Sequence, residues 1–284
     1  MQQTKLQTAH VYNPQLEQPV VELYHKKPFL KVCIVMPTYN ESGNIVNILD
    51  RIYTNEKKIK EARGNISINV LVVDDNSPDG TSQLVKEYSK KNSHVYLLKR
   101  KNKEGLGKAY IAGMKYAMKK VQPDIVFEMD ADGQHNPDYI PKMIEEVENG
   151  SDFVIGSRYI GGGATPKEWG WQREAISYFA RSISRIGLGL GDIKDCSGGF
   201  RAIRSTVLKT IDLDSLDVKG YAFQVVLLEE VVHNGFTLKE IPISFDQRDM
   251  GESKMGMSDI IEGWKIIFRV RSKRIGSKLH SFIH

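Results

Sequence analysis

Residues 30–41, LKVCIVMPTYNE, join a run of apolar and β-branched residues to a polar segment that begins at Pro37. The same order recurs at residues 68–81, INVLVVDDNSPDGT, and at residues 125–137, IVFEMDADGQHNP. Short apolar runs of this kind are typical of buried strands in a parallel sheet. Ligands bind outside the carboxyl ends of such strands, so the polar segments indicate a binding site along one edge of the sheet.

Between these runs lie longer amphipathic segments, and the alternation predicts an α/β fold with a mainly parallel central sheet. The expected strands are residues 30–36, 68–73, 95–99, 125–129 and 153–155, and the expected helices are residues 44–60, 81–90, 106–120 and 138–148. The alternation frays after residue 155, which predicts a mixed C-terminal half. There we expect strands at residues 199–203 and 237–245 and helices at residues 173–186, 222–233 and 259–268.

The length of 284 residues, 40% of them hydrophobic, is sufficient for a substantial core. Three parts are expected: a polar N-terminal extension at 1–28, a main domain at 29–257, and an amphipathic helix with a basic tail at 258–284. The sequence contains neither the apolar region of a signal peptide nor an apolar stretch of transmembrane length. Its two cysteines, Cys33 and Cys196, match neither a disulfide framework nor the spacing of a zinc site. A cytoplasmic location is therefore expected.

The net charge of +5 belongs entirely to the end of the chain. The last sixteen residues carry five basic residues and no acidic one, so residues 1–268 hold 40 − 5 = 35 bases against 35 acids. A neutral body argues against a dedicated nucleic-acid-binding protein, and no nucleic-acid partner is expected.

Asp130 and Asp132 stand two residues apart at the end of an extended run, where alternate side chains point the same way. Both carboxylates can therefore reach one hard cation such as Mg²⁺ or Mn²⁺, and Gln134 can add or orient a further oxygen. A turn rich in Asp and Gly is the alternative. An EF-hand is excluded because, counted from Asp130, Pro141 stands at the position of the bidentate glutamate.

Other nucleotide and hydrolase motifs fail on spacing. Residues 105–108, GLGK, are followed by Ala109 where a P-loop needs Ser or Thr, and Tyr110 stands at the third glycine of the dinucleotide pattern. Residues 251–255, GESKM, lack the last glycine of a serine hydrolase elbow.

Taken in order, residues 36–41, 72–81 and 130–137 resemble glycosyltransferase family 2, which has the GT-A fold. Residues 105–110, 156–159, 197–201 and 245–254 resemble the dolichyl-phosphate mannosyltransferase group of that family. The resemblance extends from about residue 31 to 256 and implies that residues 29–257 form a GT-A catalytic domain.

The resemblance implies metal-dependent, inverting transfer of mannose from GDP-mannose to the phosphate of dolichol or another polyprenol. A phosphate monoester has its second pKa at about 6, so this acceptor is already anionic and needs no general base. Two alternatives remain open, namely the same reaction with UDP-glucose as donor and a non-catalytic subunit that binds a nucleotide sugar.

The family pattern also implies roles for individual residues. The donor nucleotide would be held by Pro37, Tyr39, Glu41, Asp74, Asp75, Lys103 and Lys254. The metal would be held by Asp130, Asp132 and Gln134, and the acceptor phosphate by Arg158, Arg173 and Ser177. Arg248, Ser253 and Lys254 resemble a loop that closes over the phosphates, and the expected catalytic residues are Asp132, Arg158, Arg173 and Arg248. Alternatively, Arg158 and Arg173 are surface charges and Pro37 only shapes a turn.

A lipid acceptor requires contact with a membrane. The predicted helix at residues 173–186 and the last helix at 259–268 each carry an apolar stripe, and the last helix leads into the basic tail. Basic residues near an anionic membrane contribute about 1 kcal/mol each. We therefore expect peripheral association with the cytoplasmic face of a membrane. Ordinary packing of the stripes, a solvated tail, and docking onto a separate membrane subunit are the alternatives.

Overall fold

The computed structural model describes residues 8–11, 20–23, 28–165, 181–182, 184–216 and 222–245. For residues 8–11 and 20–23 it describes the backbone only. Most of the predicted helix at residues 173–186, and all of the predicted helix and basic tail at 258–284, lie outside these ranges.

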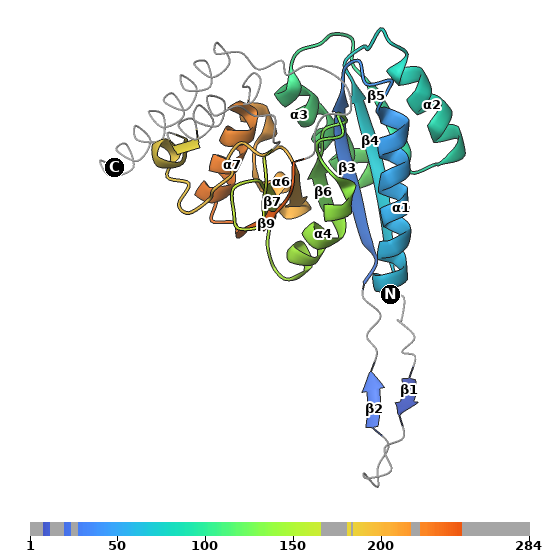
Figure 1. Ribbon diagram of the computed structural model, residues 1–284, viewed down its shortest axis with the longest axis vertical. Helices are drawn as coiled ribbons and strands as arrows, with labels where there is room; N and C mark the ends of the chain where they lie inside the picture. Colours follow the sequence, from blue (N-terminus) through green and yellow to red (C-terminus); the bar gives the residue numbers. More distant parts are fainter. Residues whose placement is uncertain are drawn as a thin grey trace.

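A seven-stranded sheet in the order β5-β4-β3-β6-β8-β7-β9 forms the centre of the fold (Figure 1). Its strands are β3 (Leu30–Thr38), β4 (Ile66–Asp74), β5 (Val95–Lys99), β6 (Ile125–Glu128), β7 (Phe153–Ser157), β8 (Arg201–Arg204) and β9 (Leu238–Pro242). Among these strands, β8 alone runs antiparallel to its neighbours, β6 and β7. The carboxyl ends of the other strands therefore share one edge of the sheet, and β8 begins at that edge. This confirms the predicted α/β class with a mainly parallel sheet.

Helices cover both faces of the sheet. One core lies under α1 (Ile45–Arg63), α2 (Thr81–Lys91) and α4 (Ile140–Glu148), and the other lies under α3 (Leu106–Tyr116), α6 (Ser205–Thr210) and α7 (Ala222–His233). Within β3, Ile34 packs into the first core, whereas its neighbours Cys33 and Val35 pack into the second. The period of two in a strand thus divides one apolar run between two cores, which gives an α/β/α sandwich.

Gly113 sets how closely α3 approaches the sheet. A Cβ atom at this position would overlap the Val35 side chain and lie 2.8 Å from Val73 Cγ2. Glycine therefore lets α3 lie against β3 and β4, and this close packing fixes the position of Tyr110 near the end of β6.

The observed elements differ from the expected ones in several places. The expected helix at residues 106–120 is α3 followed by a π-helical turn (Ala117–Val121), and the one at 138–148 begins with a 3-10 turn (Pro137–Tyr139). The expected strand at 237–245 ends at Pro242, beyond which Ser244 makes one isolated bridge to Ala164. The sequence patterns gave no sign of α6 or of the 3-10 turn Leu213–Leu216, because both are shorter than two helical turns.

The N-terminal extension contains a pair of strands that the sequence did not predict. β1 (Thr8–Val11) and β2 (Val20–Leu23) pair in antiparallel fashion as a separate two-stranded sheet, drawn at the bottom of Figure 1. No helix within the described ranges has both the length and the apolar character needed to cross a bilayer.

Candidate functional site

The acidic loop after β6 presents two carboxylates at the carboxyl edge of the sheet. Asp130 and Asp132 are both partly exposed, whereas Gln134 is nearly buried. The Tyr110 hydroxyl donates a 2.7 Å hydrogen bond to Asp130 Oδ1, and the Gln134 N–H donates one of 3.1 Å to Asp132 Oδ1. The protein thus orients one oxygen of each carboxylate.

This donor set suits a hard cation with open coordination positions. Across the described ranges, no cluster of three or more His, Cys, Asp and Glu side chains is placed to hold a metal ion. The loop offers two carboxylates and an amide, and Mg²⁺ in proteins is commonly held by one or two carboxylates together with water and substrate phosphates. The residues present fit such an ion.

His135 is hydrogen-bonded to the backbone of the acidic loop. Its Nδ1 accepts a 2.8 Å hydrogen bond from the Asp130 N–H, and its ring stacks on Phe200 with the centroids 5.2 Å apart. Burial lowers the pKa of His135 to about 4. The ring is therefore neutral at pH 7 and carries its proton on Nε2, since Nδ1 acts as the acceptor. The sequence pattern did not indicate a role for His135.

Two of the predicted donor-binding residues, Tyr39 and Lys103, contact each other. The Lys103 Nζ lies 3.7 Å from the centroid of the Tyr39 ring, a cation–π contact between the loop after β3 and the loop before α3. Nearby, Glu41 Oε2 accepts a 3.0 Å hydrogen bond from Asn44 Nδ2, and Pro37 is half-buried within β3.

Asp74, also predicted to bind the donor, is fully buried, and its carboxylate is hydrogen-bonded to other groups of the protein. Its carboxylate accepts hydrogen bonds from the Thr38 hydroxyl at 3.1 Å, from the Ser82 hydroxyl at 2.6 Å, and from both the N–H and the hydroxyl of Ser77. In this arrangement Asp74 shapes the loop after β4, and direct contact with a nucleotide would require this network to open.

Asp75 pairs with a cation that the sequence did not single out. Its Oδ1 lies 2.9 Å from Arg100 Nη1, and both side chains are largely buried. Burial raises the pKa of the Asp75 carboxyl, and the Arg100 guanidinium opposes that rise. The link joins the loop after β4 to the end of β5.

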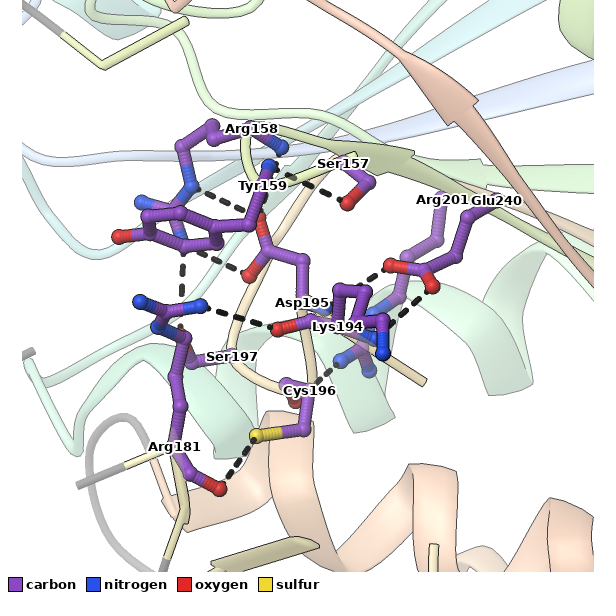
Figure 2. A network of polar contacts seen from close by, with 10 residues as sticks. All are labelled: Ser157, Arg158, Tyr159, Arg181, Lys194, Asp195, Cys196, Ser197, Arg201 and Glu240. Atoms are coloured by element: carbon purple, nitrogen blue, oxygen red, sulfur yellow. Dashed lines mark hydrogen bonds and ion pairs between the residues drawn. The ribbon is translucent and has the colours of Figure 1, made fainter. Parts of the chain in front are cut away.

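Arg158 follows β7 and is bound by Asp195 through two parallel hydrogen bonds (Figure 2). Nε lies 2.8 Å from Oδ2, and Nη2 lies 2.8 Å from Oδ1. The Arg158 side chain is 10% exposed, so the alternative of a surface charge is wrong. The Nε–Nη2 edge of the guanidinium is hydrogen-bonded to Asp195. The predicted bidentate binding of a phosphate therefore cannot use that edge while this pair is intact.

A second buried ion pair lies beneath the acidic loop, and sequence analysis did not predict it. Arg201 Nη1 lies 3.6 Å from Glu128 Oε2, and both side chains are fully buried. Burial raises the pKa of Glu128 to about 7, and Arg201 opposes that rise. The pair connects β6 to β8 directly under the predicted metal site. Apolar residues flank both charges in the sequence, as in the segments 125–129, IVFEM, and 200–203, FRAI, so pattern alone did not reveal the pair.

The structure therefore places Tyr39 in contact with Lys103 and places Asp130 and Asp132 in one loop. Arg158 follows β7 at the same edge of the sheet as these loops. The predicted acceptor residues Arg173 and Ser177, and the predicted loop residues Arg248, Ser253 and Lys254, lie outside the described residues.

Residues 33–212 match the model of glycosyl transferase family 2. The chain is 38% identical over 254 residues to the polyprenol monophosphomannose synthase of Mycolicibacterium smegmatis, covering 89% of this chain and 90% of that protein. It is 39% identical over 226 residues to the undecaprenyl-phosphate mannosyltransferase of Micrococcus luteus, covering 80% and 88%.

Solved structures with a similar fold share little sequence. Mannosyl-3-phosphoglycerate synthase from Rubrobacter xylanophilus superposes with a TM-score of 0.62 at 17% identity, covering 87% of this chain and 75% of that one. Glucosyl-3-phosphoglycerate synthase from Mycobacterium tuberculosis, in complex with Mn²⁺ and UDP-glucose, superposes with a TM-score of 0.57 at 17% identity, covering 84% and 77%.

Proposed function

Because the chain belongs to glycosyl transferase family 2, we propose that it transfers mannose from GDP-mannose, with inversion, to the phosphate of dolichol or another polyprenol. Membership of the family makes the protein a glycosyltransferase, and the similarity in fold confirms the GT-A architecture predicted from the sequence.

The observation that carries the proposal is the convergence of three chemically different loops on one sheet edge. The loop after β3 provides Tyr39 in contact with Lys103, the loop after β6 provides Asp130 and Asp132, and the loop after β7 provides Arg158. Such an edge can hold a nucleotide, a metal-bound diphosphate and a second phosphate side by side.

Asp130, Asp132 and Gln134 would hold Mg²⁺ or Mn²⁺. When bound, the ion neutralises charge on the departing diphosphate. Support comes from the oriented carboxylates and from the similar M. tuberculosis structure, which contains Mn²⁺ together with a nucleotide sugar.

The acceptor phosphate acts as the nucleophile without a general base, because a phosphate monoester is already ionised near neutral pH. The site has to collect two anionic groups and exclude other nucleophiles, which is a task of positioning and electrostatics. Two relatives are named polyprenol monophosphomannose synthase and undecaprenyl-phosphate mannosyltransferase, and both names support a polyprenyl phosphate acceptor.

We further propose that the protein associates peripherally with a membrane at its cytoplasmic face, either directly or through a membrane subunit. Residues 184–188 are helical, and Ile186 there is 73% exposed. An exposed isoleucine on the predicted interfacial helix supports contact with lipid. The basic tail, Arg269 to His284, adds attraction to anionic headgroups.

The test is a donor-by-acceptor assay. Purified protein is incubated with labelled GDP-mannose or UDP-glucose, with Mn²⁺ or Mg²⁺, and with a polyprenyl phosphate, and the label in the organic phase is counted. Transfer of mannose supports the proposal, whereas transfer of glucose alone supports the alternative donor. Nucleotide binding without any lipid product supports the non-catalytic subunit.

The same assay tests the metal ligands. Asp132→Asn keeps the side-chain shape but removes one charge from the metal site, so we expect transfer to fall at least about 100-fold. Asp124→Asn is the matched control, because Asp124 precedes β6 at the opposite end of the strand, where it accepts a 2.8 Å hydrogen bond from the Lys31 N–H. Normal turnover of Asp132→Asn would remove Asp132 from the metal site.

A further inference from the structure

We infer that Asp195 is a positioning residue for Arg158, fixing the guanidinium orientation that the acceptor phosphate meets. This inference rests on the proposed function, in which Arg158 contacts that phosphate. Asp195 itself is fully buried and is not expected to touch either substrate.

Asp195 binds Arg158 at three points. Its Oδ2 accepts hydrogen bonds from the Arg158 backbone N–H at 3.1 Å and from Nε at 2.8 Å, and its Oδ1 accepts one from Nη2 at 2.8 Å. One carboxylate thus holds both the main chain and the side chain of the same residue. Planar, two-point pairing of this kind fixes geometry as well as adding energy.

Aromatic rings restrict the guanidinium further. Its Cζ lies 5.1 Å from the ring centroid of Tyr159 and 5.1 Å from that of Phe245. Nη2 also lies 3.3 Å from the Ser197 hydroxyl. With Nε and Nη2 engaged in this way, the plane of the guanidinium is held in one orientation.

Asp195 is in turn held from β9. The Glu240 carboxylate accepts a 2.8 Å hydrogen bond from the Asp195 N–H and a 2.9 Å hydrogen bond from the Lys194 N–H (Figure 2). Glu240 therefore fixes the backbone from which the Asp195 side chain projects, which couples β9 to the loop after β7.

Gly198 makes room for the Asp195 carboxylate. A Cβ atom at residue 198 would lie 3.3 Å from Asp195 Oδ1 and 3.2 Å from the Gly156 carbonyl oxygen, both tighter than ordinary van der Waals contact. Glycine is therefore favoured at residue 198, because a side chain there would crowd the carboxylate that orients Arg158.

The electrostatics agree with a positioning role. Burial disfavours the charge of Arg158, but the adjacent Asp195 carboxylate holds the pKa of that guanidinium above its ordinary value. In return Arg158 lowers the pKa of Asp195 against the effect of burial. Both groups stay charged and nearly cancel, so Arg158 contributes at this site through fixed direction more than through net charge.

The test is Asp195→Asn in the full-length protein, measured with GDP-mannose, Mn²⁺ and a polyprenyl phosphate. The amide keeps the shape but turns an N–H₂ toward one donor of Arg158 and loosens its orientation. We expect the KM for the acceptor to rise about 10-fold, with the KM for GDP-mannose and the affinity for Mn²⁺ unchanged. Asp152→Asn is the control, since Asp152 pairs with Arg204 at the opposite end of β7.

A merely structural role would give a different result. Loss of folded protein lowers the rate at every acceptor concentration without moving KM, and that outcome overturns the inference. A double-mutant cycle adds a second criterion. Arg158→Lys alone should raise the acceptor KM, and adding Asp195→Asn should change it by less than about 2-fold, because Asp195 acts through Arg158. If the fold-changes in acceptor KM of the two single variants multiply in the double variant, the two residues act independently, and the inference is overturned.

Glu240→Gln covers the case in which Asp195→Asn does not fold. Glu240 is only partly buried and acts one step further away, so the acceptor KM should rise by a smaller factor, about 3-fold. An unchanged acceptor KM in this variant then overturns the inference. A wild-type protein that transfers no sugar to polyprenyl phosphate instead contradicts the proposed function.

Discussion

At the scale of single residues, Tyr110 shows how one hydroxyl connects a helix to the predicted metal site. The side chain is fully buried on α3 and stacks on Phe223 of α7, with the ring centroids 6.0 Å apart. Its hydroxyl donates to Asp130 Oδ1 at 2.7 Å. Burial, reinforced by the charge of Asp130, raises the pKa of Tyr110 well above its ordinary value, so the hydroxyl remains a donor at any working pH.

Tyr110→Phe removes that donor while keeping the ring. A group that orients a metal ligand typically contributes 10-fold or more in metal affinity, so we expect Mn²⁺ to bind about 10-fold more weakly. Electron paramagnetic resonance titration of Mn²⁺ in the presence of GDP measures the affinity directly. Tyr116→Phe, on the same helix, is the control, and equal Mn²⁺ affinity in both variants would show that Asp130 needs no help from Tyr110.

The placement of some site residues could be predicted from spacing, and that of others could not. The alternation of Asp130 and Asp132 follows from the period of two in an extended chain. In contrast, the environment of the buried Asp74 depends on hydroxyls from three other positions, Thr38, Ser77 and Ser82, which pattern alone does not place.

At the scale of elements, the loop between β4 and α2 is built around Asp79. Its Oδ1 accepts hydrogen bonds from the N–H of Thr81 at 3.0 Å and from the Thr81 hydroxyl at 2.6 Å, and its Oδ2 accepts one from the Ser42 N–H at 2.9 Å. Gly80 precedes the helix with φ of 90°, so a residue without a side chain occupies the cap and Asp79 takes over the capping role.

Asp79→Ala should lower the free energy of unfolding by about 1 kcal/mol at pH 7, the usual value of a helix cap. Although partial burial acts in the opposite direction, hydrogen bonds from Thr81 and Ser42 lower the pKa of Asp79 to about 2. The contribution is therefore complete above the ordinary carboxyl pKa of about 4 and is lost as the pH falls toward 2.

Urea unfolding at pH 7, 5 and 3 measures this dependence. The difference between wild type and Asp79→Ala should be the same at pH 7 and 5 and smaller at pH 3. Substitution of the exposed Asp192 by alanine should leave stability unchanged at each pH. A difference that grows as the pH falls would contradict the assigned role.

At the scale of the whole molecule, β8 joins the two halves of the site. It lies between β6 and β7, so the segment that leads into it reaches the same edge as the loops that follow its neighbours. Phe200 beneath His135 and Asp195 beside Arg158 both come from this segment. The buried ion pair of Glu128 and Arg201 links β6 to β8 within the sheet.

The distribution of charge also belongs to this scale. Replacing the basic residues of the tail by serine should weaken binding to vesicles that contain anionic lipid, at about 1 kcal/mol per residue near the surface, and so by at least about 100-fold. The residues to be replaced are Arg269, Arg271, Lys273, Arg274 and Lys278.

Sedimentation with vesicles of mixed anionic and zwitterionic lipid measures the binding. Transfer to a short, water-soluble prenyl phosphate is the control and should be preserved, because the residues of the described site are unchanged. Undiminished binding of the serine variant would assign membrane contact to another part of the chain, such as the surface around Ile186.

The amino-acid sequence by itself determined the α/β class, the strands that end at the site, and the positions of the acidic loop and of Arg158 after their strands. Each of these follows from local order, since an apolar run that stops at a polar segment marks a strand and its carboxyl end. Only the tertiary structure decided which side chains meet. Asp195 lies 37 residues from Arg158, and their contact exists because β8 runs antiparallel between β6 and β7. Pairing across a sheet depends on strand order and direction, which short-range patterns do not encode.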